Sequence, residues 1–271
     1  MIIDEDIVAG GVTPFIITKL IERHERERQR YRLLHDYYMG DHRILNRRKR
    51  GKNVANNRIM CNHAKYITDM TQSYLVGNPV TYAVSDEYDI EAIKNEYLEQ
   101  DMPSVDSEIV KNMSIYGKAY ELIYADEKSK PRSVRLDPEH TFVCYSQSAF
   151  EKPLFAVYYY KKYDLDGYCT GSICRVYDES FIYTYTGLDS YTALSLQNVE
   201  PHYFFDVPII EYRNNTEMQG DFEQLITQIN IDAHSNEGPH PRQRCGPSLL
   251  WVCRQSRHAV FRYTILTMLI S

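Results

Sequence analysis

Residues 37–82 read YYMGDHRILNRRKRGKNVANNRIMCNHAKYITDMTQSYLVGNPVTY, and this stretch decides how the chain is organised. Gly40 is expected to end a helix, because glycine takes the left-handed conformation after a last helical turn at little cost. A basic loop follows, and then a second helix that begins at an N-cap, Asn57, and runs to Leu75. The Gly-Asn-Pro triplet at 77–79 turns the chain into a strand. This order of elements predicts a scaffold rather than a catalytic centre.

The loop between these two helices carries a dense group of positive charges. Arg47, Arg48, Lys49, Arg50 and Lys52 place five cations within six residues. Such side chains commonly bind phosphate, so they form a candidate nucleic-acid contact. Acidic residues of a partner protein and a mobile surface loop are the alternatives. Because the chain has a formal net charge of −6, any attraction to nucleic acid must come from this local patch.

A long helix is expected before the loop, beginning at Thr13-Pro14. Its inward positions recur at helical spacing and comprise Ile17, Leu20, Ile21, His24, Tyr31, Leu34 and Tyr38. The second helix has a comparable stripe, made of Ile59, His63, Ala64, Ile67, Met70, Tyr74 and Leu75. His63 is expected at the edge of the core rather than as a ligand. After the turn, alternation at Val80, Tyr82 and Val84 predicts a strand.

Between residues 22 and 32 nearly every side chain of the first helix is charged, with alternating sign. Helical spacing predicts three ion pairs, each worth about 0.2–0.5 kcal/mol: Glu22–Arg26, Glu25–Arg28 and Glu27–Arg30. Glu22, Arg26, Glu27 and Arg30 form our candidate contact with a neighbouring subunit. A helix face exposed to water is the alternative.

Downstream, the periodicity changes from helical to alternating. Two further helices are expected over residues 88–100 and 104–116, the second ended by Gly117. Strands are then predicted at 119–124, 133–137, 141–145, 154–163, 172–177, 181–186 and 207–212. The fold class is therefore α+β, with N-terminal helices followed by an antiparallel meander of hairpins. A further helix opens at Gly220-Asp221, with Phe222, Leu225, Ile226 and Ile229 along it, and is expected to be the start of a long helix.

The chemistry-bearing motifs of common enzymes are absent from the sequence. There is no glycine-rich phosphate loop, no nucleophile elbow and no zinc-protease helix motif. The Asp164 to Gly167 run is expected to be a turn, because it lacks the downstream ligands of a calcium loop. The six cysteines include no C-x-x-C pair and are expected to be reduced. We therefore expect no enzyme activity, no cofactor and no metal, and neither a signal peptide nor a membrane span.

The sequence changes character after Asp232. Residues 235–271 contain five arginines, no lysine and one acid, Glu237, together with the chain's single tryptophan, Trp251. We interpret this stretch as translation in a shifted frame, with a true basic C-terminal arm as the alternative. The expected organisation is an N-terminal arm (1–17), an α+β domain (18–233) and an atypical tail (234–271).

An ordered set of short motifs resembles the portal proteins of long-tailed bacteriophages. The first part comprises Tyr37-Tyr38-x-Gly40-Asp41-His42-x-Ile44, Asn56-Asn57-Arg58-Ile59, Asn62, Lys65-Tyr66-Ile67 and Tyr74-x-x-Gly77-Asn78-Pro79-Val80. The second part comprises Ile115-Tyr116-Gly117-Lys118-Ala119-Tyr120-Glu121, Tyr212-Arg213-Asn214-Asn215 and Gly220-Asp221-Phe222-Glu223. The resemblance covers about residues 19–233, in the family's order.

This resemblance implies a non-catalytic virion protein with a portal wing-like domain. Family members form a ring, typically dodecameric, at one capsid vertex, and double-stranded DNA enters and leaves through the channel. Their partners are copies of themselves, the capsid protein, the terminase and head-completion proteins, with no membrane. The resemblance thus implies a place in the virion or in the bacterial host cytoplasm. Compared with the family pattern, the chain is expected to be C-terminally truncated, without stem, clip and crown, and so to be a prophage remnant that no longer functions. An independent nucleic-acid-binding module that uses the basic loop 47–52 is the alternative function.

Overall fold

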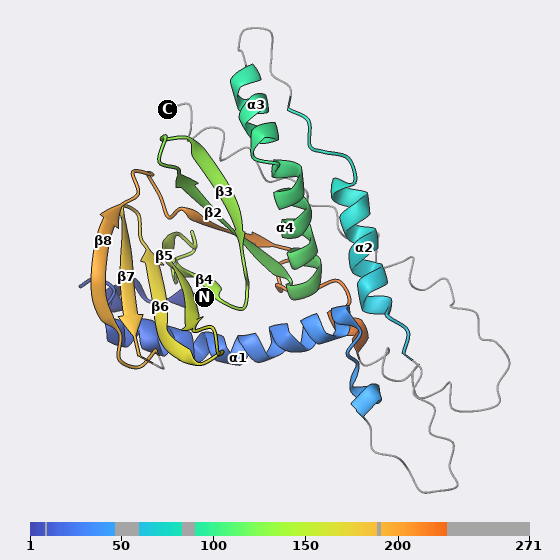
Figure 1. The fold of residues 1–271 in the computed structure, drawn as a ribbon, viewed down its shortest axis with the longest axis horizontal. Helices are drawn as coiled ribbons and strands as arrows, with labels where there is room; N and C mark the ends of the chain where they lie inside the picture. The colour runs from blue at the N-terminus through green and yellow to red at the C-terminus, as the bar shows by residue number, and fades with distance from the viewer. Residues whose placement is uncertain (9, 47–59, 83–89, 189–190, 227–271) are drawn as a thin grey trace, which may run out of the picture. The chain divides into compact units, whose positions relative to one another are not determined.

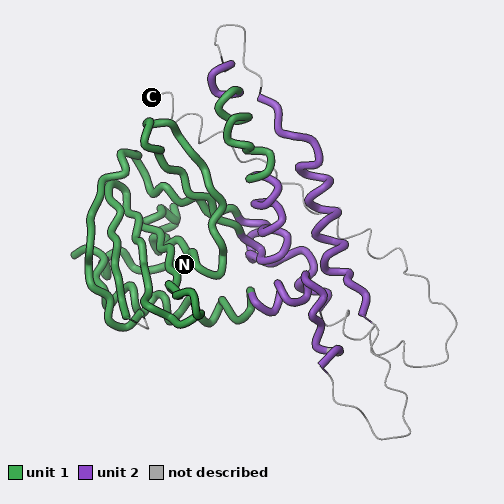
Figure 2. The backbone as a smooth tube through the Cα atoms, in the orientation of Figure 1, with its two compact units in different colours: residues 1–31, 95–105, 119–212 green, residues 32–94, 106–118, 213–271 purple. Residues whose placement is uncertain are grey.

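The computed structural model describes all residues except 9, 47–59, 83–89, 189–190 and 227–271. Its described residues form two compact units (Figure 2). Unit 1 comprises residues 1–31, 95–105 and 119–212, and unit 2 comprises 32–94, 106–118 and 213–271. Each unit is therefore assembled from segments that lie far apart in the sequence.

Helices come first along the chain and strands follow (Figure 1). The helices are α1 (Pro14–Met39), α2 (His63–Val76), α3 (Glu91–Glu99) and α4 (Met102–Tyr116), with short 3-10 turns η1 (Glu5–Ile7), η2 (Arg43–Asn46) and η3 (Glu223–Leu225). The strands are β1 (Ile2–Ile3), β2 (Lys118–Ala125), β3 (Pro131–Leu136), β4 (Thr141–Ser146), β5 (Pro153–Tyr163), β6 (Cys169–Tyr177), β7 (Phe181–Gly187), β8 (Ser195–Pro201) and β9 (Ile209–Arg213).

Unit 1 contains two sheets. One has six strands in the order β1-β4-β5-β6-β7-β8, and the other has three in the order β3-β2-β9. Strands β4 to β8 are consecutive antiparallel neighbours, so they form the predicted meander. β1 pairs in parallel with β4. The antiparallel order follows from the short turns between the strands, which reverse the chain without a crossover.

Strand β5 of the six-stranded sheet contributes buried residues to both faces of the sheet. Along β5, Phe155, Val157 and Tyr159 pack with residues of α1 such as Ile17 in one apolar cluster. Ala156, between them, belongs to a second cluster, which includes residues of the three-stranded sheet. Because successive strand residues point to opposite faces, one strand contributes to both cores. Unit 1 is thus layered as helix, sheet and sheet, as Figure 1 shows.

A buried hydrogen bond ties α1 to the sheet. His24 is fully buried, and its Nδ1 lies 2.9 Å from the hydroxyl of Tyr159 on β5. Arg28, one turn further along α1, pairs with Glu25 at 2.8 Å and with Glu139 at 3.3 Å. Burial raises the pKa of Tyr159, so its hydroxyl keeps its proton. The charged stretch of α1 is therefore attached to unit 1 by specific polar contacts.

The core of unit 2 includes facing residues of α2 and α4. Ala64 and Ile67 of α2 are buried, and the buried Ser114 hydroxyl donates a hydrogen bond to the Thr68 hydroxyl at 3.3 Å. Further along, the Gln72 amide donates to the Ser107 hydroxyl at 2.7 Å. Short hydroxyl-bearing side chains allow two helices to approach closely while their polar atoms stay paired.

Most predicted helices and strands are confirmed, with the following differences. Helix α2 begins at His63, because the Asn62 side chain accepts a hydrogen bond from the Lys65 N–H; the predicted cap, Asn57, is outside the described residues. No strand forms over residues 79–82. Strand β8 was missed. Near residue 221 the described chain makes the turn η3, and the rest of the predicted helix falls on residues that the structure does not describe.

The cysteines in the described part, Cys61, Cys144, Cys169 and Cys174, are free thiols, and burial raises the pKa of Cys144 and Cys174 to about 12. Among the described helices, none combines the length and apolar character that crossing a membrane requires.

Replacing Tyr159 by phenylalanine should lower the free energy of unfolding by about 1–3 kcal/mol, because the buried His24 ring loses its hydroxyl partner. Tyr163→Phe removes the same hydroxyl from an exposed position of β5 and should change stability by no more than about 0.5 kcal/mol. Urea unfolding followed by circular dichroism measures both. Equal effects of the two substitutions would contradict this role for the His24–Tyr159 bond.

Candidate functional site

The five cations of the basic loop, Arg47, Arg48, Lys49, Arg50 and Lys52, lie outside the described residues. Their assignment to nucleic acid stays a prediction. The other candidate residues, on α1, are described and can be placed individually.

Some charged side chains of α1 form ion pairs within the chain, and others are exposed. The predicted Glu25–Arg28 pair forms at 2.8 Å, and the Arg28 side chain is only 16% exposed. Glu22 pairs with Lys19 at 2.8 Å instead of with Arg26. Arg26 is exposed, and within the described part of the chain it has no ion-pair partner. Of the candidate contact residues, Arg26 is therefore the one most available to another molecule.

Glu27 and Arg30 both interact with Tyr31 of the same helix. The Tyr31 hydroxyl donates to Glu27 Oε2 at 3.0 Å, and the Arg30 guanidinium lies 5.6 Å from the Tyr31 ring centre. Burial, followed by the Glu27 charge, raises the pKa of Tyr31. These contacts hold Glu27 and Arg30 in place, so the predicted face is partly structural.

Helix α2 presents an apolar stripe to solvent. Met70 and Tyr74 were predicted to point inward, but they are 44% and 88% exposed, and Tyr66 is 57% exposed. The three side chains are spaced four residues apart and therefore lie along one side of the helix. The prediction failed because Thr68, a polar residue, occupies the buried side and pairs with Ser114.

The turn from α1 into α2 depends on Gly40 and Asn62. Gly40 has φ +87°, and its N–H donates to Tyr37 while the Asp41 N–H donates to Asp36, a pattern that closes the last turn of a helix. The Asn62 amide donates to the Tyr38 carbonyl at 2.9 Å. Since Asn62 also caps α2, one side chain joins the end of α1 to the start of α2.

Tyr38 provides a second connection among the helices of unit 2. The ammonium groups of Lys65 on α2 and Lys111 on α4 lie 5.1 and 5.9 Å from its ring centre. Its hydroxyl donates to Asp69 at 3.4 Å, and Lys65 pairs with the same carboxylate at 2.8 Å. The hydrogen bond to Asp69 raises the pKa of Lys65, which therefore stays charged.

The two later motifs meet in one backbone junction of unit 2. Gly117 follows α4 with φ +83°, and its carbonyl accepts a hydrogen bond from the Asn214 N–H at 2.9 Å. The Asp221 N–H donates to the Ser114 carbonyl at 2.8 Å. A Cβ on Gly117 would lie 2.0 Å from the Met218 carbonyl oxygen. The segments are therefore in direct backbone contact, and glycine is required.

Side chains close the same junction. A Cβ on Gly220 would lie 2.3 Å from the Ile115 carbonyl oxygen, so this position also excludes a side chain. The Asn214 amide donates to the Gln219 carbonyl at 3.0 Å and to Asp221 Oδ1 at 2.8 Å. The Gly220 N–H donates to Glu223 Oε2 at 3.1 Å. The junction is a rigid polar turn that joins the end of β9 to the end of α4.

Two tyrosine–glutamate contacts occur beside this junction, within unit 1. The Tyr120 hydroxyl donates to Glu211 Oε2 at 2.9 Å, and the Tyr212 hydroxyl donates to the buried Glu121. β2 and β9 thus each supply one tyrosine and one carboxylate to the other. Burial and the Glu211 charge raise the pKa of Tyr120 well above its usual value. The Tyr-Glu and Glu-Tyr dipeptides were the signal that could have identified these contacts.

Within the described residues, no group of three or more histidine, cysteine, aspartate or glutamate side chains is arranged to hold a metal ion. What the geometry provides is precise attachment between segments, together with two exposed surfaces: Arg26 on α1 and the stripe Tyr66, Met70 and Tyr74 on α2. Both are suited to contact with another protein rather than to bond-making chemistry.

Comparison with known proteins agrees with these motifs. A family described as "Phage portal protein, SPP1 Gp6-like" matches residues 17–231. The portal protein of Bacillus phage SPP1 is 29% identical over 232 residues, which cover 77% of this chain and 45% of that protein. The chain thus spans about half the length of the curated relative it matches.

Gly117→Ala and Gly167→Ala form a matched pair that tests the junction. Both glycines have φ +83°, but a Cβ on Gly167 would meet nothing within 4 Å. Gly167→Ala should cost about 1–2 kcal/mol of unfolding free energy for the left-handed conformation alone. Gly117→Ala adds the clash with Met218 and should cost at least about 2 kcal/mol more. Urea unfolding measures both free energies. Equal costs would show that the close approach of Met218 to Gly117 does not exclude a methyl group.

Proposed function

The chain belongs to the SPP1 Gp6-like family of phage portal proteins, and we propose that it is a structural subunit of the phage head-tail connector, packing side by side with copies of itself. The single observation that carries the proposal is the family match over residues 17–231, which includes the junction at Gly117 and Gly220. A structural role is consistent with side chains that serve attachment between segments, as in the Tyr38 and Asn214 contacts.

The finer parts of this role extend the same proposal. Copies of the chain would form a closed ring, typically of twelve subunits in the family, as a component of the virion. Double-stranded DNA would pass through the ring, and the capsid protein, the terminase and head-completion proteins would contact it. Because the matched region corresponds to 45% of the SPP1 portal protein, these partners are inferred from the family and not assigned to residues here.

Closed ring packing requires that one surface of a subunit meets a different surface of the next copy. The described residues offer two chemically different candidates. One is the charged face of α1, where Arg26 is exposed. The other is the apolar stripe of Tyr66, Met70 and Tyr74 on α2. Exposed aromatic and methionine side chains are typical of protein contacts, because they bury large areas at small entropic cost.

The charge of the whole chain favours a partner role for α1. With a formal net charge of −6, a second copy carries more acidic than basic side chains, 37 against 31. Glu25 and Glu139 are already paired with Arg28. The exposed Arg26 is therefore complementary in charge to acidic side chains of a second copy. We therefore propose that Arg26, with Arg30 beside it, contacts an acidic surface of the next copy.

Arg26→Glu combined with Arg30→Glu should weaken self-association by about tenfold or more, because like charges would then meet. Lys162→Glu makes the same kind of charge change on an exposed part of β5 and serves as the control. Mass photometry across a concentration series measures the oligomer distribution, and electron microscopy counts subunits in any rings. Unchanged assembly of the double variant would exclude this face of α1. A chain that stays monomeric at every concentration would contradict self-packing.

A salt titration of DNA binding separates this role from the basic-loop alternative. A nucleic-acid-binding module should bind tightly, with an affinity that falls steeply as salt is raised. A connector subunit tested alone should bind DNA weakly at all salt concentrations. Tight, salt-sensitive binding that is lost when Arg48 and Arg50 are replaced by glutamine would favour the basic-loop function instead.

A further inference from the structure

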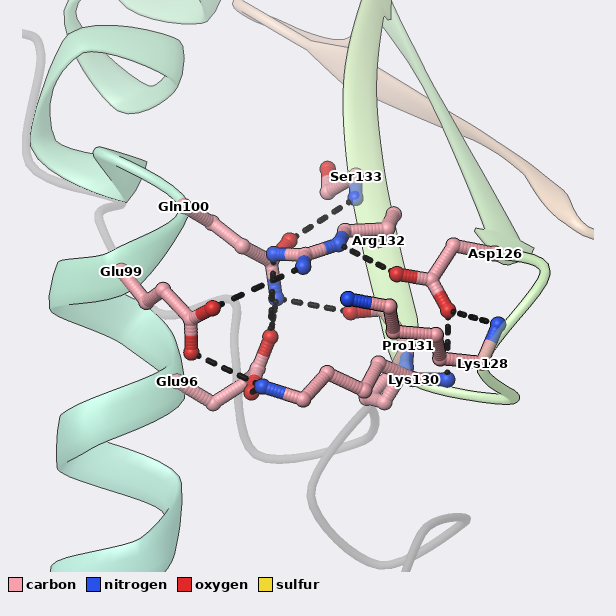
Figure 3. Close-up of polar contacts among 9 residues, drawn as sticks. All are labelled: Glu96, Glu99, Gln100, Asp126, Lys128, Lys130, Pro131, Arg132 and Ser133. Carbon is pink, nitrogen blue, oxygen red and sulfur yellow. Dashed lines mark hydrogen bonds and ion pairs between the residues drawn. The ribbon is translucent and has the colours of Figure 1, made fainter.

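Helix α3 has little apolar attachment. None of its residues is buried, and Leu98 is 68% exposed. The C-terminal half of α3 belongs to unit 1, where it lies beside the β2–β3 hairpin (Figure 3). Because a helix of nine residues is too short to be stable by itself in water, α3 needs contacts with other elements. The contacts with the hairpin therefore decide whether this half of α3 stays ordered.

The contacts between α3 and the hairpin include several ion pairs, drawn in Figure 3. Lys130 of the hairpin lies 2.9 Å from Glu99 and 3.4 Å from Glu96. Arg132 on β3 lies 3.1 Å from Glu96 and 3.8 Å from Glu99, and its Nε donates to Asp126 at 3.1 Å. Asp126 also accepts from the backbone N–H groups of Lys128 and Lys130. Asp126 thus orients Arg132 toward the two glutamates of α3.

Gln100 adds a contact that resembles strand pairing. Its side-chain amide donates to the Pro131 carbonyl at 2.7 Å, and its carbonyl accepts from the Ser133 N–H at 3.1 Å. β3 is the edge strand of its sheet, so these backbone groups point away from β2. One carboxamide therefore occupies the position that a further strand would take. Gln100 also donates to Glu96 at 3.0 Å, which joins this contact to the ion pairs.

The connection from the C-terminal end of α3 to α4 is short. Only Gln100 and Asp101 separate α3 from α4, and Asp101 has φ +50°, which is left-handed. Aspartate tolerates this conformation better than most residues, but it is a strained joint. A bend at Asp101 changes the direction of α3 without breaking α4, so the joint provides a pivot.

We propose that the contacts of Glu96, Glu99 and Gln100 with Lys130, Arg132 and Ser133 form an ionic latch that holds α3 on the β2–β3 hairpin and that salt releases by a pivot at Asp101. The paired side chains range from 20% to 54% exposed, so dissolved ions reach them. The hydrogen bond to Lys130 lowers the pKa of Glu99, which therefore stays ionised at neutral pH. The latch is thus closed at low ionic strength and opens as screening increases.

Hydrogen–deuterium exchange across a salt series tests the latch. Between about 0.1 and 1 M NaCl the screening length falls from about 10 to about 3 Å. Exchange at α3 and at the Ser133 amide should accelerate together, by roughly two- to fivefold or more. Exchange in β5 and β6 should change much less, because apolar burial holds them. Salt-independent exchange at α3 and Ser133 would overturn the proposal.

Charge-swapped variants separate the latch from general helix stability. Glu99→Lys should open α3 at low salt, and adding Lys130→Glu should restore protection, because the pair is re-formed with reversed signs. Glu91→Gln is the control, since it removes the Glu91–Lys94 pair within α3 without touching the hairpin. If Glu91→Gln increases exchange as much as Glu99→Lys, or if the swap fails to restore protection, the contact is not a latch. A loss of protection in β5 and β6 would reveal unfolding, and the Gln100→Ala variant would then replace Glu99→Lys in the comparison with Glu91→Gln.

Discussion

The close approach of two backbone segments at Gly117 and Gly220 is the constraint on which the arrangement of the strands and helices around it depends. No side chain fits at either glycine, because the opposing carbonyl oxygens lie where a Cβ would be. The segments that meet there are almost a hundred residues apart, yet they share hydrogen bonds through Asn214 and Asp221. Along the chain, β2 begins at Lys118, directly after Gly117, and β9 ends at Arg213, directly before Asn214.

A subunit of a large assembly has to keep its own shape while it presents surfaces to neighbours. Polar contacts serve the first need here: His24 with Tyr159, Tyr38 with its two lysines, and the paired tyrosines and glutamates of β2 and β9. Hydrogen bonds and ion pairs of this kind fix the relative orientation of the elements they join, which apolar packing alone specifies less narrowly. Tyr74 and Arg26 are exposed and contribute to no core, and it is on this ground that we propose them as contacts with neighbours.

The success of the sequence-based predictions followed the strength of each local signal. Helix α1 and strands β4 to β7 bury one face or both faces strongly, so their periodicity is plain in the sequence. β8 was missed because every one of its residues is exposed and no alternation marks an edge strand of this kind. The start of α2 was misplaced because two asparagines, Asn57 and Asn62, are equally good caps by residue type, and only the contact of Asn62 with Tyr38 distinguishes them. The ion pair of Glu22 was misassigned because Lys19 and Arg26 are both within helical reach.

The sequence by itself determined the succession of helices and strands, the inward residues of α1 and the family to which the chain belongs. These depend on local periodicity, turn residues and short motifs, each of which is contained in one continuous segment of sequence. Only the tertiary structure decided that the motif at Gly117 contacts the motif at Gly220, that Tyr74 is exposed, and which charges of α1 are already paired. Those outcomes depend on which atoms meet across long stretches of chain, and a pattern within one segment carries no information about its distant neighbour.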